Sequence, residues 1–192
     1  MKKIIWITSS FVVIGILIYF AIQLFVVAEE SLHLAATQGN LNSISILIKK
    51  GKDVNQSTSK GFTPLHAATI GGHEEAIKLL LDNGALIDPT EKEENRTPLH
   101  IATQNGNKRI VELLLISRGA DINARAIDNI TPLHMAVIIS NEEIVELLLK
   151  NGADTTILAK IRNTQYSPLQ LAEIMPNENI VKLLKKESIN NK

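Results

Sequence analysis

The chain has 192 residues, of which 45% are hydrophobic, and its 20 basic side chains balance its 20 acidic ones. This balance excludes the strongly basic field that drives nucleic-acid binding, and the absence of cysteine excludes disulfides and thiolate metal sites. The length suits one ordinary domain or one modest array of repeats.

An apolar segment comes first in the chain. Between Ile4 and Ala28 there is no charged residue, and a helix of this length, at ~1.5 Å per residue, spans a hydrocarbon core of ~30 Å. Lys2 and Lys3 precede the segment and two glutamates follow it, which favours a cytoplasmic N-terminus. We therefore predict one apolar helix at residues 1–28, a transmembrane signal anchor that makes the chain a single-pass membrane protein with the following domain outside.

A cleaved signal peptide is the alternative interpretation of residues 1–28. Small residues up to Ala28 offer a peptidase site, and cleavage near Ala28 would leave a periplasmic or secreted protein. The apolar run is longer than the ~7–15 residues typical of a signal peptide, which favours the anchor.

After the apolar segment the sequence repeats itself. Four similar tetrapeptides follow one another at steps of 34, 34 and 36 residues: Thr63-Pro64-Leu65-His66, Thr97-Pro98-Leu99-His100, Thr131-Pro132-Leu133-His134 and Ser167-Pro168-Leu169-Gln170. Self-similarity at this period indicates a stack of small units with a large ordered surface. Such a stack usually has no reaction centre, so the pattern favours binding over catalysis.

Each unit is predicted to contain two helices. Thr63 is a suitable N-cap for the first helix, Pro64 suits its first position, and Gly72 ends it. The second helix is amphipathic and covers residues 74–81, 108–115 and 142–149 in three successive units. We expect its buried stripe to include Leu79, Leu113 and Leu147. Because one unit cannot cover its own apolar stripe, neighbouring units must stack.

The pattern Thr-Pro-Leu-His-x-Ala, then Gly, then Ile-Val-Glu-Leu-Leu-Leu, then Gly-Ala-Asp-Ile-Asn at residues 119–123 resembles the ankyrin repeat. The resemblance covers residues 29–192 and implies an all-α ankyrin-repeat solenoid of helix pairs joined by β-hairpin-like loops, preceded by the one apolar helix. It divides into five repeats, at about 29–60, 61–94, 95–128, 129–164 and 165–192. It also implies that other proteins bind to the hairpin tips and the concave face of the inner helices.

Departures from the repeat pattern suggest where a partner binds. The excursion from Gly152 to Ser167 is enlarged and apolar, as either a tolerated insertion or a contact loop. In the family that this chain resembles, the residue before each Thr-Pro lies at a hairpin tip, and most of these residues here are apolar or aromatic. The predicted partner-binding strip, if its side chains do not pack on neighbouring loops instead, comprises Lys60, Phe62, Ile70, Arg96, Gln104, Ile127, Ile130, Ile138, Ile139 and Tyr166.

The histidines do not suggest a metal site. His33, His66, His100 and His134 share one position in successive units, and units ~8–10 Å apart cannot bring their nitrogens within ~2.1 Å of one ion. We expect each imidazole to bond to the backbone of the adjoining loop. No nucleophile elbow or phosphate loop occurs in the sequence, and the helical carboxylates fit a solvated face. We predict no catalytic residue, metal, cofactor or small-molecule substrate.

The sequence therefore predicts a protein–protein interaction module, an adaptor that is exported and tethered to the membrane. Two alternatives remain open. One is a secreted effector that binds a host protein, and the other is a structural membrane protein that assembles through its apolar helix.

Overall fold

The computed structural model describes residues 31–175 and 177–190. The chain divides into two units, 1–31 and 32–192, and the fold below is that of the second. The predicted transmembrane segment at residues 1–28 lies outside the described residues. Within the described ranges, no helix is both long and apolar enough to cross a membrane.

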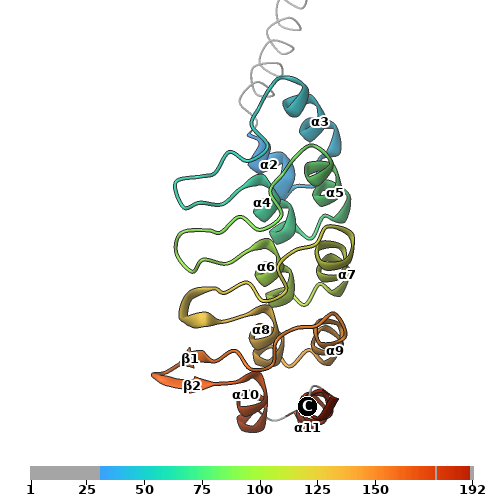
Figure 1. Ribbon diagram of the computed structural model, residues 1–192. Coiled ribbons are helices and arrows are strands. Elements are labelled where there is room, and N and C mark those ends of the chain that lie inside the picture. The colour runs from blue at the N-terminus through green and yellow to red at the C-terminus, as the bar shows by residue number, and fades with distance from the viewer. Residues whose placement is uncertain (1–30, 176, 191–192) are drawn as a thin grey trace, which may run out of the picture. The chain divides into compact units, whose positions relative to one another are not determined.

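Five helix pairs form the second unit, which confirms the predicted helical repeats (Figure 1). The inner helices are α2 (Leu32–Thr37), α4 (Pro64–Gly71), α6 (Pro98–Gln104), α8 (Pro132–Ile138) and α10 (Pro168–Ile174). The outer helices are α3 (Leu41–Lys49), α5 (Glu74–Asp82), α7 (Lys108–Glu112), α9 (Glu142–Lys150) and α11 (Glu178–Asn190). Each inner helix contacts the next, and long excursions between the pairs all project to the same side, away from the outer helices.

Local side-chain bonds determine where the helices begin. The Thr63 hydroxyl accepts a hydrogen bond from the His66 N–H, and Pro64 takes the first helical position, where its missing N–H costs nothing. The same cap recurs at Thr97, Thr131 and Ser167. Asparagine side chains cap four of the outer helices, at Asn40, Asn107, Asn141 and Asn177. The cap predicted at Thr63 is confirmed.

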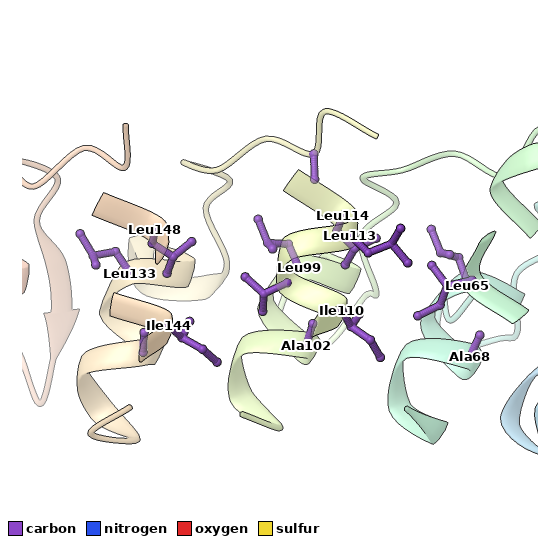
Figure 2. Close-up of a cluster of buried hydrophobic side chains, with 14 of the residues drawn as sticks. Leu65, Ala68, Leu99, Ala102, Ile110, Leu113, Leu114, Leu133, Ile144 and Leu148 are labelled. Atoms are coloured by element: carbon purple, nitrogen blue, oxygen red, sulfur yellow. The ribbon is translucent and has the colours of Figure 1, made fainter. Parts of the chain in front are cut away.

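The core runs between the inner and outer helices and through successive pairs (Figure 2). Its fully buried leucines on the outer helices and η1 share one position in the repeat: Leu80, Leu114, Leu148 and Leu184. The predicted core position lies one residue earlier. It is right for Leu113, which is buried, and wrong for Leu79 and Leu147, which are only partly buried against the core. A helix turns by about 100° per residue, so adjacent leucines face different neighbours.

The third outer helix contains one extra residue. Ten positions separate Glu74 from Gly84, whereas eleven separate Lys108 from Gly119. The structure absorbs the insertion in η1, a π-helical turn at Leu113–Ser117 that follows α7. A π turn accommodates one more residue without breaking the helix, so Leu114 keeps its place in the core.

The last excursion forms a regular β-hairpin, in agreement with the predicted β-hairpin-like loops between helix pairs. Strands β1 (Ala159–Ile161) and β2 (Thr164–Tyr166) pair antiparallel. Arg162 and Asn163 connect them with φ values of 48° and 67°. A two-residue hairpin of type I′ requires positive φ at both positions, and Asn tolerates it well. The preceding excursion carries only a 3-10 turn, η2 (Ile127–Asn129).

Hydrogen bonds also join one excursion to the next. The Asn55 side chain accepts from the Leu86 N–H at 2.8 Å and donates to the Gly84 carbonyl at 3.0 Å. One repeat later Asp88 stands at this position, and its Oδ2 accepts from the Asp121 N–H at 3.0 Å. Its Oδ1 is buried and has no hydrogen-bond partner among the described residues. Burial, and secondarily the Asp121 charge, raises the pKa of Asp88 despite the bond from the Asp121 N–H.

Candidate functional site

The repeated histidines link each inner helix to the next excursion. Their Nε2 atoms lie 2.9–3.2 Å from the carbonyl oxygens of the residues that precede the next Thr-Pro or Ser-Pro. These four contacts are His33–Phe62, His66–Arg96, His100–Ile130 and His134–Tyr166. The expected backbone bonding of the histidines is confirmed. In the described part of the chain, no cluster of three or more His, Asp or Glu side chains is placed to hold a metal ion.

The imidazoles of the three internal repeats belong to His66, His100 and His134. Each ring must be neutral to accept a hydrogen bond at Nδ1 and donate one from Nε2. In the third repeat the Thr97 N–H donates to Nδ1 of His100 at 3.3 Å, so the ring proton sits on Nε2 and is donated to the Ile130 carbonyl at 3.0 Å. Burial lowers the pKa of His100 to about 4, outweighing the bond to Ile130, which raises it. Burial also lowers the pKa values of His66 and His134.

The residues bonded by the histidines lie at the bases of the excursions, not at the tips as predicted. Tyr166 pairs with Ala159, while the tip of that hairpin is formed by Arg162 and Asn163. Likewise, the Ile130 carbonyl accepts from the Ala126 N–H at 2.9 Å and closes the η2 turn. Each histidine bond holds the residue at the base of the excursion close to the inner helices. Phe62, Arg96, Ile130 and Tyr166 are accordingly half-buried.

Four residues of the predicted strip line one hollow between the second and third repeats. They are Phe62, Ile70, Arg96 and Gln104, and the hollow has a volume of about 450 Å³. Nη1 of Arg96 donates to Oε1 of Gln104 at 2.9 Å, which ties the base of the excursion to the end of α6. The Phe62 ring meets the His66 ring edge-on, with centroids 5.6 Å apart.

The cation beside this hollow is neutralised within the protein. Arg96 Nε lies 3.0 Å from a carboxylate oxygen of Glu94 and 3.4 Å from one of Glu91. Glu91 is fully buried, and its oxygens accept the N–H groups of Glu93, Glu94 and Arg96 at 2.7, 2.9 and 3.2 Å. Burial alone would raise the pKa of Glu91, but these bonds outweigh it and lower the pKa. The loop is thus ordered around an ionised carboxylate.

A larger groove lies between the fourth and fifth repeats. Its volume is about 620 Å³, and it is lined by Asp128, Ile130, Ile138, Lys160, Ile161, Arg162, Tyr166, Leu171, Ile174 and Met175. Three residues of the predicted strip, Ile130, Ile138 and Tyr166, come together here. The other three, Lys60, Ile127 and Ile139, line neither the groove nor the hollow.

The predicted strip does not include the part of the groove that α10 supplies. Ile174 is 62% exposed at the end of that helix, six residues after its proline. The same position in the other three proline-led helices holds Ile70, Gln104 and Ile138, all of which were predicted. The same spacing in the last repeat therefore points to Ile174. No repeat spacing of this kind predicts that Met175 or Ile161 lines the groove.

Comparison with known proteins agrees with this architecture. The family model described as ankyrin repeats (3 copies) matches residues 32–126 and 124–192. Among similar proteins, protein phosphatase 1 regulatory subunit 12A of Mus musculus is 47% identical over 53 residues, 28% of this chain and 5% of that protein. Protein phosphatase 1 regulatory subunit 27 of Homo sapiens is 36% identical over 63 residues, 33% of this chain and 41% of that protein.

A putative ankyrin repeat protein of Rickettsia bellii is 41% identical over 64 residues, 33% of this chain and 27% of that protein. The matches therefore span less than half the length of each of these relatives. The family match, in contrast, extends over nearly all of the described repeats. The chain belongs to the ankyrin repeat family, whose repeats serve as protein–protein interaction modules.

Proposed function

We propose that this chain is an adaptor that binds another protein across its inner helices and excursions. The observation that carries the proposal is a row of exposed isoleucines at one repeat position. Ile70, Ile138 and Ile174 lie in the last turn of three inner helices and are 50%, 37% and 62% exposed. Exposed apolar side chains that recur on one face are typical of partner sites.

The repeat stack holds this face in shape before a partner arrives. Each histidine bond, and each excursion bond such as that of Asn55 to Leu86, joins residues about 30 positions apart. A surface held by such cross-links loses little conformational entropy on association, so more of the contact energy is available for affinity.

Two of the relatives are named as regulatory subunits of protein phosphatase 1, and so as proteins that act on another protein. The matched segments cover about a third of this chain or less. They support the class of function, binding to a protein, and leave the partner to experiment.

We further propose that the repeats are exported and held at a membrane by the apolar segment at residues 4–28. The uncharged run and the lysines before it support this arrangement. Fractionation of cells that express a C-terminally tagged chain, with the N-terminus of the product determined by mass spectrometry, tests it. An intact N-terminus in the membrane fraction is expected. A soluble product that begins near Glu29 would favour the cleaved, secreted alternative.

Crosslinking and affinity capture from native cells test the adaptor itself. The wild type is compared with an Ile70→Asp/Ile138→Asp/Ile174→Asp variant. The control variant is Leu86→Asp/Ile116→Asp, whose two positions are 62% and 59% exposed and line neither the hollow nor the groove. All of these side chains are exposed, so circular dichroism should show that each variant folds. We expect a partner captured by the wild type and control but lost from the triple variant. Equal capture by all three would refute this face as the interface.

A second comparison separates the adaptor from assembly through the apolar helix. Scrambling residues 4–28 while keeping their hydrophobicity should leave partner capture unchanged if the repeats bind. Loss of capture after scrambling would favour a structural membrane protein that assembles through that helix.

A further inference from the structure

The groove between the fourth and fifth repeats combines an apolar lining with positive charge on one wall. Ile130, Ile138, Tyr166 and Ile174 supply apolar surface from two excursions and two inner helices. The β1–β2 hairpin forms the charged wall, with Lys160 on β1 and Arg162 at its tip. The groove has a volume of about 620 Å³, within the ~300–1,000 Å³ range of pockets that enclose a ligand group.

The two cations of this wall differ from Lys60 and Arg96, the two cations of the predicted strip. Lys60 lies 2.9 Å from a carboxylate oxygen of Glu93, and Arg96 is bound by Glu91 and Glu94. The side chains of Lys160 and Arg162 are exposed and make no ion pair or hydrogen bond within the described part of the chain. Asp128 is the single carboxylate among the lining residues, so the groove carries net positive charge.

We infer that this groove binds a segment of a partner protein in which a bulky apolar side chain is flanked by carboxylates. The apolar side chain displaces water from Ile138, Tyr166 and Ile174, and the carboxylates face Lys160 and Arg162. Complementary charge at the rim orients such a segment and speeds its encounter, while the apolar anchor supplies most of the affinity. The inference rests on the proposed function and adds the chemistry of the bound segment.

The hairpin geometry supports a fixed position for the cations. The β1–β2 pairing joins Ala159 to Tyr166, and the bond of His134 Nε2 to the Tyr166 carbonyl at 3.2 Å holds the Tyr166 end of the hairpin base. Ala159 at this base is fully buried. The charged wall is therefore supported by the core, and a bound segment need not order a loose loop.

A displayed library of random dodecapeptides, selected on the purified full chain, tests the inference without knowledge of the natural partner. Selected peptides are then measured against a Lys160→Glu/Arg162→Glu variant and against Ile174→Asp. The control is Lys50→Glu/Lys52→Glu, which makes the same change in net charge at exposed sites in the first repeat. Circular dichroism verifies that every variant is folded.

We expect the selected peptides to combine a large apolar residue with nearby Asp or Glu. Their binding should weaken about 10-fold or more in both groove variants, stay within about 2-fold in the control, and fall as salt screens the exposed charges. Selection on the charge-reversed variant should instead enrich Lys or Arg beside the apolar residue.

Three results would overturn the inference. They are the absence of any enriched peptide, enriched peptides without carboxylates, and binding that both groove variants retain. Peptides that both groove variants retain and a further variant, Ile70→Asp, loses would place the contact at the hollow between the second and third repeats. The proposed adaptor function is tested separately, by whether capture of a native partner depends on Ile70, Ile138 and Ile174.

Discussion

Lowering the pH from 7.5 to 5 should destabilise the repeats through their buried histidines, and His100 shows the reason. Its imidazole is fully buried, accepts the Thr97 N–H at Nδ1 and donates from Nε2 to the Ile130 carbonyl. A second proton on the ring would remove the acceptor at Nδ1 and place an unpaired charge in the core. Folding therefore favours the neutral ring.

The magnitude follows from the two pKa values of His100. Unfolding returns the pKa from about 4 to its ordinary 6.5, so between these values the unfolded chain binds a proton that the folded chain does not. Each pKa unit is worth ~1.4 kcal/mol, so the stabilisation present above pH 6.5 falls by about 3 kcal/mol as the pH drops below 4. Roughly 2 kcal/mol of this is already lost at pH 5. His66 and His134, whose pKa values are also lowered, add losses of the same sign.

Urea unfolding followed by circular dichroism at pH 7.5, 6 and 5 measures the effect. His100→Gln is the informative comparison, because the glutamine at this position in the last repeat, Gln170, accepts the Ser167 N–H at 2.9 Å and cannot titrate. The variant should lose about 2 kcal/mol less than the wild type between pH 7.5 and 5. Carboxylates titrate in both proteins and cancel in the comparison. Parallel pH curves for the two proteins would refute the reasoning.

Three further predictions concern stability at neutral pH, each measured by the same urea unfolding. Asp88→Asn should stabilise the chain by about 1 kcal/mol, because the amide can make both bonds that Asn55 makes and leaves no buried oxygen unpaired; an unchanged midpoint would contradict this account. Ser140 has a φ of 55° at the position where other repeats carry glycine, so Ser140→Gly should add roughly 0.5–1 kcal/mol, and a loss of stability would show that its side chain contributes. Leu80→Ala should cost ~2–5 kcal/mol and Leu79→Ala about 1 kcal/mol, since only Leu80 is fully buried; equal costs would reject this register.

Much of the fold could be predicted because its signals are short in range. The Thr63 cap acts across three residues, and the helix-ending glycines such as Gly84 need only a positive φ, here 89°. The repeat period then places these units one after another. The π turn at Leu113–Ser117 also has a sequence signal, the single extra residue before Gly119.

The repeat is visible in the sequence alone, together with the helix caps and the apolar positions along each inner helix. These depend on backbone geometry and on contacts within about one helical turn. Tertiary structure alone decided that Leu80 rather than Leu79 is buried, and that Tyr166 lies at the base of its hairpin. It also decided that Arg96 is neutralised while Lys160 is not. These outcomes depend on contacts between adjacent repeats or across a folded excursion, whose geometry exists only after the units have stacked.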